Sequence, residues 1–109
     1  MGKKQTKEYL KEYLRRLDLD EDIRPHDVIL YGSFLRDDYD PEKSDIDLLI
    51  ISDTFEKMDE DDRLRVLYRK TAGLPLDLHL YGFTISELKN ISPLNSLSRA
   101  LTSGVSLYT

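Results

Sequence analysis

Two aspartates, Asp45 and Asp47, lie at the start of an apolar segment and are the residues of this chain best suited to chemistry. Residues two apart in a strand point to the same face of a sheet, so the two carboxylates are expected to project together. Neighbouring negative charges repel each other unless a cation lies between them, and hard divalent cations such as Mg²⁺ prefer carboxylate oxygens. The spacing therefore predicts a metal site.

A Gly-Ser pair, Gly32 and Ser33, follows the apolar run Val28–Tyr31, where a strand is expected to end and a helical turn to begin. Glycine lets the backbone approach a ligand closely, and serine at a helix N-terminus offers a hydroxyl and an amide that suit a phosphate. A phosphate site beside a metal site implies phosphoryl or nucleotidyl transfer. The chain has no Walker lysine motif, which excludes P-loop hydrolysis.

The Gly-Ser pair, Arg36 and the run Ser44–Leu48 together resemble the signature of the minimal nucleotidyltransferase (MNT) family of the DNA polymerase β superfamily. In that family a Gly-Ser pair is followed by Asp-x-Asp about a dozen residues on, and a third aspartate lies on a later strand. Asp77 is the candidate for this third position. The segment Ser103–Tyr108 also resembles the Gly-Val-x-Leu-Tyr ending of small proteins of this kind.

The resemblance implies roles for seven residues and a reaction. It implies three residues that act in catalysis and hold one or two Mg²⁺ ions: Asp45, Asp47 and Asp77. It implies four residues that bind the nucleotide: Gly32, Ser33, Arg36 and Ser44. The implied reaction is attack of an acceptor hydroxyl on the α-phosphate of ATP, with transfer of AMP and release of pyrophosphate.

Small single-domain proteins of this family resemble antitoxins that pair with HEPN-domain ribonuclease toxins and neutralise them by attaching AMP to a tyrosine. At 109 residues the chain is expected to form one domain, residues 1–109, without room for a module that holds an acceptor. We therefore expect a protein adenylyltransferase, an antitoxin whose partner is a HEPN-domain toxin. Homo- and hetero-oligomers both stay open.

Two alternatives remain at this stage. The chain could be a small-molecule nucleotidyltransferase of the aminoglycoside-modifying kind, completed by another chain or by dimerisation. It could also be a noncatalytic antitoxin or binding module that acts by contact. Two departures from the family pattern favour the latter: Asp37 replaces the usual glycine after Arg36, and eleven residues rather than the commoner ten separate Ser33 from Asp45.

The overall composition excludes several other functions. A net charge of −5 and a pI near 5.0 argue against direct binding to nucleic acid, which needs a basic face. The absence of cysteine excludes disulfides and thiolate metal sites. No apolar run approaches the length of a membrane span and no signal-peptide pattern is present, so a cytoplasmic protein is expected.

Hydrophobic periodicity predicts an α/β (α+β) fold, a small mixed twisted β-sheet with helices mainly on one face. The resemblance adds that this is the nucleotidyltransferase (polymerase β-like) fold. The expected elements are a helix over 4–17, strands over 27–31 and 46–51, a helix whose first turn holds the acidic run 59–62 and which ends at Gly73, a strand over 76–80, a short helix that begins with a capping box at Thr84 and Glu87, a helix from 93, and a strand over 105–108.

Three polar features have a structural interpretation at this stage. The acidic run Asp59–Asp62 suits the first turn of a helix better than a metal site, because the helix macrodipole favours negative charge there. The segment Asp18–Asp22 is expected to be a solvated linker, since it lacks the glycine and glutamate of a calcium loop. His79 is expected to be an exposed or packing histidine, although it shares a strand face with Asp77.

Overall fold

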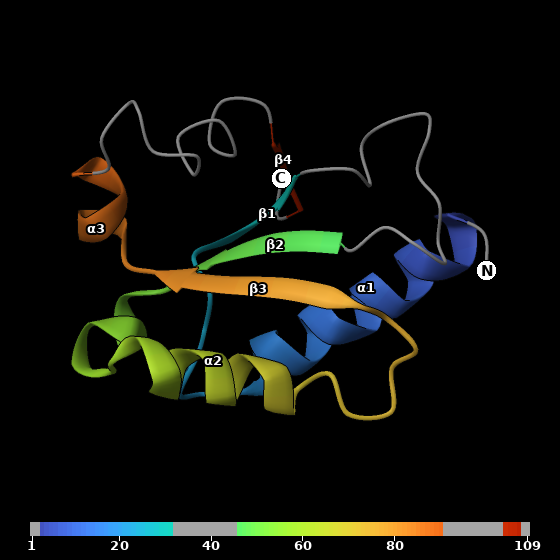
Figure 1. Cartoon of the computed structure of the whole chain (residues 1–109), viewed down its shortest axis with the longest axis horizontal. Coiled ribbons are helices and arrows are strands. Elements are labelled where there is room, and N and C mark those ends of the chain that lie inside the picture. The colour runs from blue at the N-terminus through green and yellow to red at the C-terminus, as the bar shows by residue number, and fades with distance from the viewer. Residues whose placement is uncertain (1–2, 32–45, 91–103, 108–109) are drawn as a thin grey trace.

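A four-stranded mixed sheet organises the chain in the computed structural model, which describes residues 3–31, 46–90 and 104–107 (Figure 1). The elements are α1 (Lys3–Leu19), β1 (Asp27–Tyr31), β2 (Ile46–Ile51), the 3₁₀ helix η2 (Asp53–Lys57), α2 (Glu60–Arg69), β3 (Leu78–Phe83), α3 (Ile85–Lys89) and β4 (Val105–Ser106). The helix expected from residue 93 lies outside the described residues. Among those described, no helix is both long and apolar enough to cross a bilayer.

The strands lie in the order β3-β2-β1-β4. β1 is antiparallel to both β2 and β4, whereas β2 is parallel to β3, with Ile46 opposite Leu78 and Ile51 opposite Phe83. A parallel pair needs a crossover connection, and η2 and α2 supply it between β2 and β3. The predicted mixed α/β sheet is confirmed.

The core lies on one face of this sheet, where α1 and α2 pack (Figure 1). Leu10, Tyr13 and Leu17 of α1 are buried there, as the helical spacing predicts, and Leu67 of α2 joins them. The sheet contributes alternate residues to the same cluster: Val28, Leu30, Ile46, Leu48, Ile50, Leu78 and Leu80. Because strand residues alternate, the residues between them face the other side of the sheet.

Local chemistry sets the helix ends as the sequence predicts. The Asp59 side chain caps α2 by accepting a hydrogen bond from the Asp62 amide. The first turn of α2 is acidic and its last turn carries the basic Arg69, as the helix macrodipole favours. The capping box of Thr84 and Glu87 begins α3. The acidic run at the start of α2 is therefore a helix-capping feature.

Two segments differ from the prediction, one in where a strand begins and the other in how far it is exposed. The third strand begins at Leu78, the partner of Ile46, so Leu76 and Asp77 precede it. The segment after α1 was expected to be a solvated linker, but it is partly buried. Asp20 forms an ion pair with Lys70 at 2.7 Å, and its side chain is only 18% exposed. The Lys70 hydrogen bond is the main cause that lowers the pKa of Asp20. Sequence spacing did not reveal this contact, since it joins residues fifty positions apart.

The buried hydroxyl of Tyr13 gives a first testable prediction. It donates a hydrogen bond of 3.0 Å to the Leu67 carbonyl and so ties α1 to α2. Tyr13→Phe is expected to lower the free energy of unfolding by about 1 kcal/mol, because that carbonyl still accepts from the Lys70 amide. Urea denaturation measures the effect. Tyr9→Phe, at an exposed position on the same helix, is the control and is expected to change nothing.

Candidate functional site

Three polar side chains from three strands lie in one row across the sheet. Tyr31 on β1 is the register partner of Asp47 on β2, and Asp47 is the register partner of His79 on β3. Their neighbours Leu30 and Leu48 belong to the core, so the row faces the side of the sheet away from α1 and α2. The fold thus brings Asp47, a predicted catalytic residue, beside two groups that sequence spacing did not place near it.

Asp47 is half-buried and lies next to an imidazole. Its side chain is 23% exposed, and its Oδ1 atom is 3.4 Å from His79 Nδ1. Burial, then the negative charge of Asp47, raises the pKa of the Tyr31 phenol, and Tyr81 adds to this effect. Asp47 therefore acts electrostatically on the phenol of β1 and lies next to the imidazole of β3.

Asp77, the predicted third acidic ligand, immediately precedes β3 and its side chain is exposed. Its carbonyl accepts a hydrogen bond of 3.0 Å from the amide of Ile46. The Asp77 backbone therefore lies beside the residue that separates Asp45 from Asp47 in the sequence. Within residues 3–31, 46–90 and 104–107 no three acidic or histidine side chains form a metal-binding group, so convergence of all three aspartates stays a prediction.

Five of the predicted site residues lie outside the described part of the chain: Gly32, Ser33, Arg36, Ser44 and Asp45. Their predicted roles in phosphate binding, and for Asp45 in metal binding, stay predictions. β1 reaches Tyr31, the residue directly before Gly32 in the sequence.

The donor chemistry near the start of β2 and β3 fits a hard divalent cation. Asp47 offers carboxylate oxygens at a half-buried position, and Asp77 adds an exposed carboxylate on the residue before the parallel neighbour strand. Oxygen ligands of this kind suit Mg²⁺. The sequence favours an exposed or packing role for His79, and only the register of β2 and β3 places it beside Asp47.

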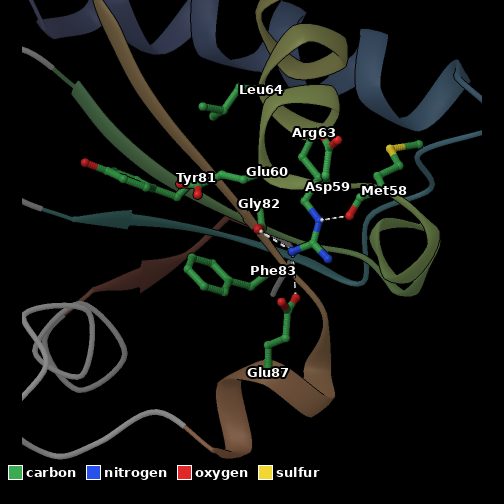
Figure 2. A pocket seen from close by; sticks show the side chains of 9 residues that line it. All are labelled: Met58, Asp59, Glu60, Arg63, Leu64, Tyr81, Gly82, Phe83 and Glu87. Atoms are coloured by element: carbon green, nitrogen blue, oxygen red, sulfur yellow. Dashed lines mark hydrogen bonds and ion pairs between the residues drawn. The ribbon is translucent and has the colours of Figure 1, made fainter.

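A cavity of about 470 Å³ lies at the other end of β3, and Figure 2 shows the side chains that line it. Its lining residues come from the junction of η2 with α2 and from α2, β3 and α3: Met58, Asp59, Glu60, Arg63, Leu64, Tyr81, Gly82, Phe83 and Glu87. Asp47, Asp77 and His79 are not among them. This cavity is therefore separate from the predicted site.

Arg63, only 9% exposed, forms one wall of that cavity (Figure 2). Its Nε donates to the carbonyls of Phe55 and Met58 at 2.9 and 3.2 Å. Its Nη1 donates to the carbonyl of Gly82 at 3.2 Å and to the Glu87 carboxylate at 2.7 Å. These bonds tie α2 to η2, β3 and α3, which indicates a structural role for this arginine.

The pKa of Tyr31 provides a test of the polar row. Asp47→Asn removes a negative charge that disfavours the phenolate, so the pKa of Tyr31 is expected to fall toward its ordinary value of about 10. Near-ultraviolet absorbance during alkaline titration measures it, with Tyr31→Phe identifying the contribution of this tyrosine among the seven of the chain. An unchanged Tyr31 titration in Asp47→Asn would contradict the proximity of the two groups.

Comparisons with known proteins agree with this fold. The model of the family described as "Nucleotidyltransferase domain" matches residues 7–102. The structure is similar to the 1.40 Å crystal structure of a Sulfolobus solfataricus protein provisionally described as a nucleotidyltransferase, with a TM-score of 0.50, 22% identity and 84% of each chain covered. No curated protein sequence matches the chain significantly.

Proposed function

Because the chain belongs to the nucleotidyltransferase domain family, we propose that it transfers AMP from ATP, with Mg²⁺, to a hydroxyl group of a partner protein. The partner that we propose is a HEPN-domain ribonuclease toxin, which would make the chain an antitoxin of the MNT kind. The polymerase β-like signature of Gly32, Ser33, Asp45 and Asp47, with its Gly-Val-x-Leu-Tyr ending, supports this finer assignment.

One structural observation carries the proposal of nucleotidyl transfer. The parallel pairing of β2 with β3 holds Asp47 and the backbone of Asp77 at the same end of the two strands, although they are thirty positions apart in the sequence. An acidic residue on β2 that is half-buried and an exposed one directly before β3 are a suitable arrangement for metal-assisted transfer of a phosphoryl group.

The proposed step follows from the roles of these residues. Asp45, Asp47 and Asp77 would hold Mg²⁺, which when bound stabilises charge on the attacking and leaving oxygens. Asp77 would take the proton of the acceptor hydroxyl, whose oxygen then forms a bond to the α-phosphorus. The bond to the bridging oxygen of the β-phosphate breaks, and pyrophosphate leaves with the electron pair.

The exposure of Asp77 supports a macromolecular acceptor. Because its side chain is exposed, an acceptor that brings its own surface has access to it.

Intact-mass measurement tests the function. The protein is incubated with ATP, Mg²⁺ and a candidate HEPN-domain partner, and a gain of one or more AMP units on the partner is expected. Pyrophosphate release driven only by a small hydroxylated compound would instead identify a small-molecule enzyme. Toxin inhibition without any mass gain, unchanged by Asp47→Ala, would identify the contact-only antitoxin that Asp37 and the longer loop favour.

A further inference from the structure

His79 lies where it can fix the orientation of a predicted metal ligand. It is the direct register partner of Asp47 across the parallel β2-β3 pair, and its Nδ1 atom is 3.4 Å from Asp47 Oδ1. This separation is slightly longer than a usual hydrogen bond. The contact joins β2, which supplies Asp47, to β3, which Asp77 directly precedes.

We propose that His79 is a positioning residue: its Nδ1–H donates to one carboxylate oxygen of Asp47 and so orients the carboxylate toward a bound divalent cation. The inference rests on the proposed function, because that function makes Asp47 a metal ligand. A ligating carboxylate is commonly held by a hydrogen bond from a neighbouring side chain, since a fixed orientation lowers the entropy lost on metal binding.

The surroundings of the pair suit this role. Asp47 is only 23% exposed, whereas His79 is 54% exposed, so the imidazole reaches the carboxylate from the open side of the sheet. Tyr31 flanks Asp47 on the opposite strand, so the carboxylate has a neighbour on each side. A second histidine of the chain, His26, contacts Asp53 at 3.0 Å on residues that carry no predicted site, and it provides a matched control.

The experiment compares three substitutions of His79 that differ in whether they retain an N–H donor and in where that donor lies. His79→Asn keeps an N–H near the position of Nδ1, His79→Gln places its amide one carbon further out, and His79→Ala removes the donor. Mn²⁺ is titrated into each protein in the presence of α,β-methylene-ATP, which cannot transfer AMP, and free Mn²⁺ is followed by electron paramagnetic resonance. Thermal unfolding checks that each variant is folded.

The expected result is a Mn²⁺ dissociation constant raised about tenfold in His79→Ala and His79→Gln, with His79→Asn close to the wild type. His26→Ala is expected to have no effect. In a transfer assay the half-saturating metal concentration should rise while the KM for ATP changes little, because His79 acts through Asp47.

Unchanged Mn²⁺ affinity in His79→Ala, with affinity lost in Asp47→Asn, would overturn the role of His79 and leave the proposed function intact. An equal loss of Mn²⁺ affinity in His79→Asn, His79→Gln and His79→Ala would also overturn it, since a donor retained near the position of Nδ1 would then not improve metal binding. Absence of Mn²⁺ binding by the wild type would overturn it as well. Conversely, the expected binding pattern without any AMP transfer would sustain the role of His79 and reject the proposed function.

Discussion

Asp47→Asn is expected to lower the rate of AMP transfer by about a thousandfold or more. An asparagine keeps the size of the side chain but replaces a charged oxygen ligand with a neutral one. Divalent cations contribute several kcal/mol to stabilising the charge of such a transition state, and each 1.36 kcal/mol corresponds to about a tenfold change in rate. A discontinuous assay with radiolabelled ATP measures the rate over this range.

Asp53→Asn is the matched control for that experiment. Asp53 also contacts a histidine, His26, but is 64% exposed and lies in η2, away from the β2-β3 row. It is expected to retain full activity. The free energy of unfolding of Asp47→Asn should equal or exceed that of the wild type, because the substitution removes a half-buried charge. Transfer that persists in Asp47→Asn would show that this aspartate is not a catalytic ligand.

Arg63→Met is expected to lower the free energy of unfolding by about 3 kcal/mol. The methionine keeps an apolar side chain but leaves the carbonyls of Phe55 and Gly82, and the Glu87 carboxylate, without their charged donor. Breaking a buried ion pair costs about 3 to 5 kcal/mol, and the lower value applies because the Glu87 side chain is 43% exposed. Urea denaturation at neutral pH gives the value.

Arg65→Met on the same helix is the control, because its side chain is 68% exposed and its ion pair with Asp62 lies within one helical turn. We expect a change below about 0.5 kcal/mol there. A similar loss of unfolding free energy in Arg63→Met and Arg65→Met would mean that the buried contacts of Arg63 stabilise the fold no more than an exposed ion pair does.

The pH dependence of stability gives an independent check on the Arg63 pair. Burial alone would raise the pKa of Glu87, but hydrogen bonds from the Thr84 amide and from Arg63 outweigh it, so the net pKa is lowered. The stabilisation from Glu87 is therefore present above its unfolded pKa of about 4.3 and is lost as the pH falls through the folded value. Arg63→Met should make the loss of stability below about pH 5 shallower.

Much of the fold follows from local chemistry and could be predicted. Apolar residues at helical spacing, such as Leu10 and Leu17, specify which face of α1 is buried. Side-chain caps at Asp59 and Thr84 begin their helices where the sequence predicts, because capping involves residues only three positions apart. The candidate aspartate pair was also visible, since its spacing of two residues is itself the signal.

The sequence by itself therefore determined the order of the described elements and the faces that they bury, and it supplied the hypothesis that Asp47 holds a metal ion. Only the tertiary structure decided which residues stand beside Asp47: His79 and Tyr31 come from other strands, and strand register places them there. The same applies to Arg63, whose partners lie up to twenty-four residues away. Contacts of this kind depend on how strands and helices pack, and no pattern within a single segment encodes that packing.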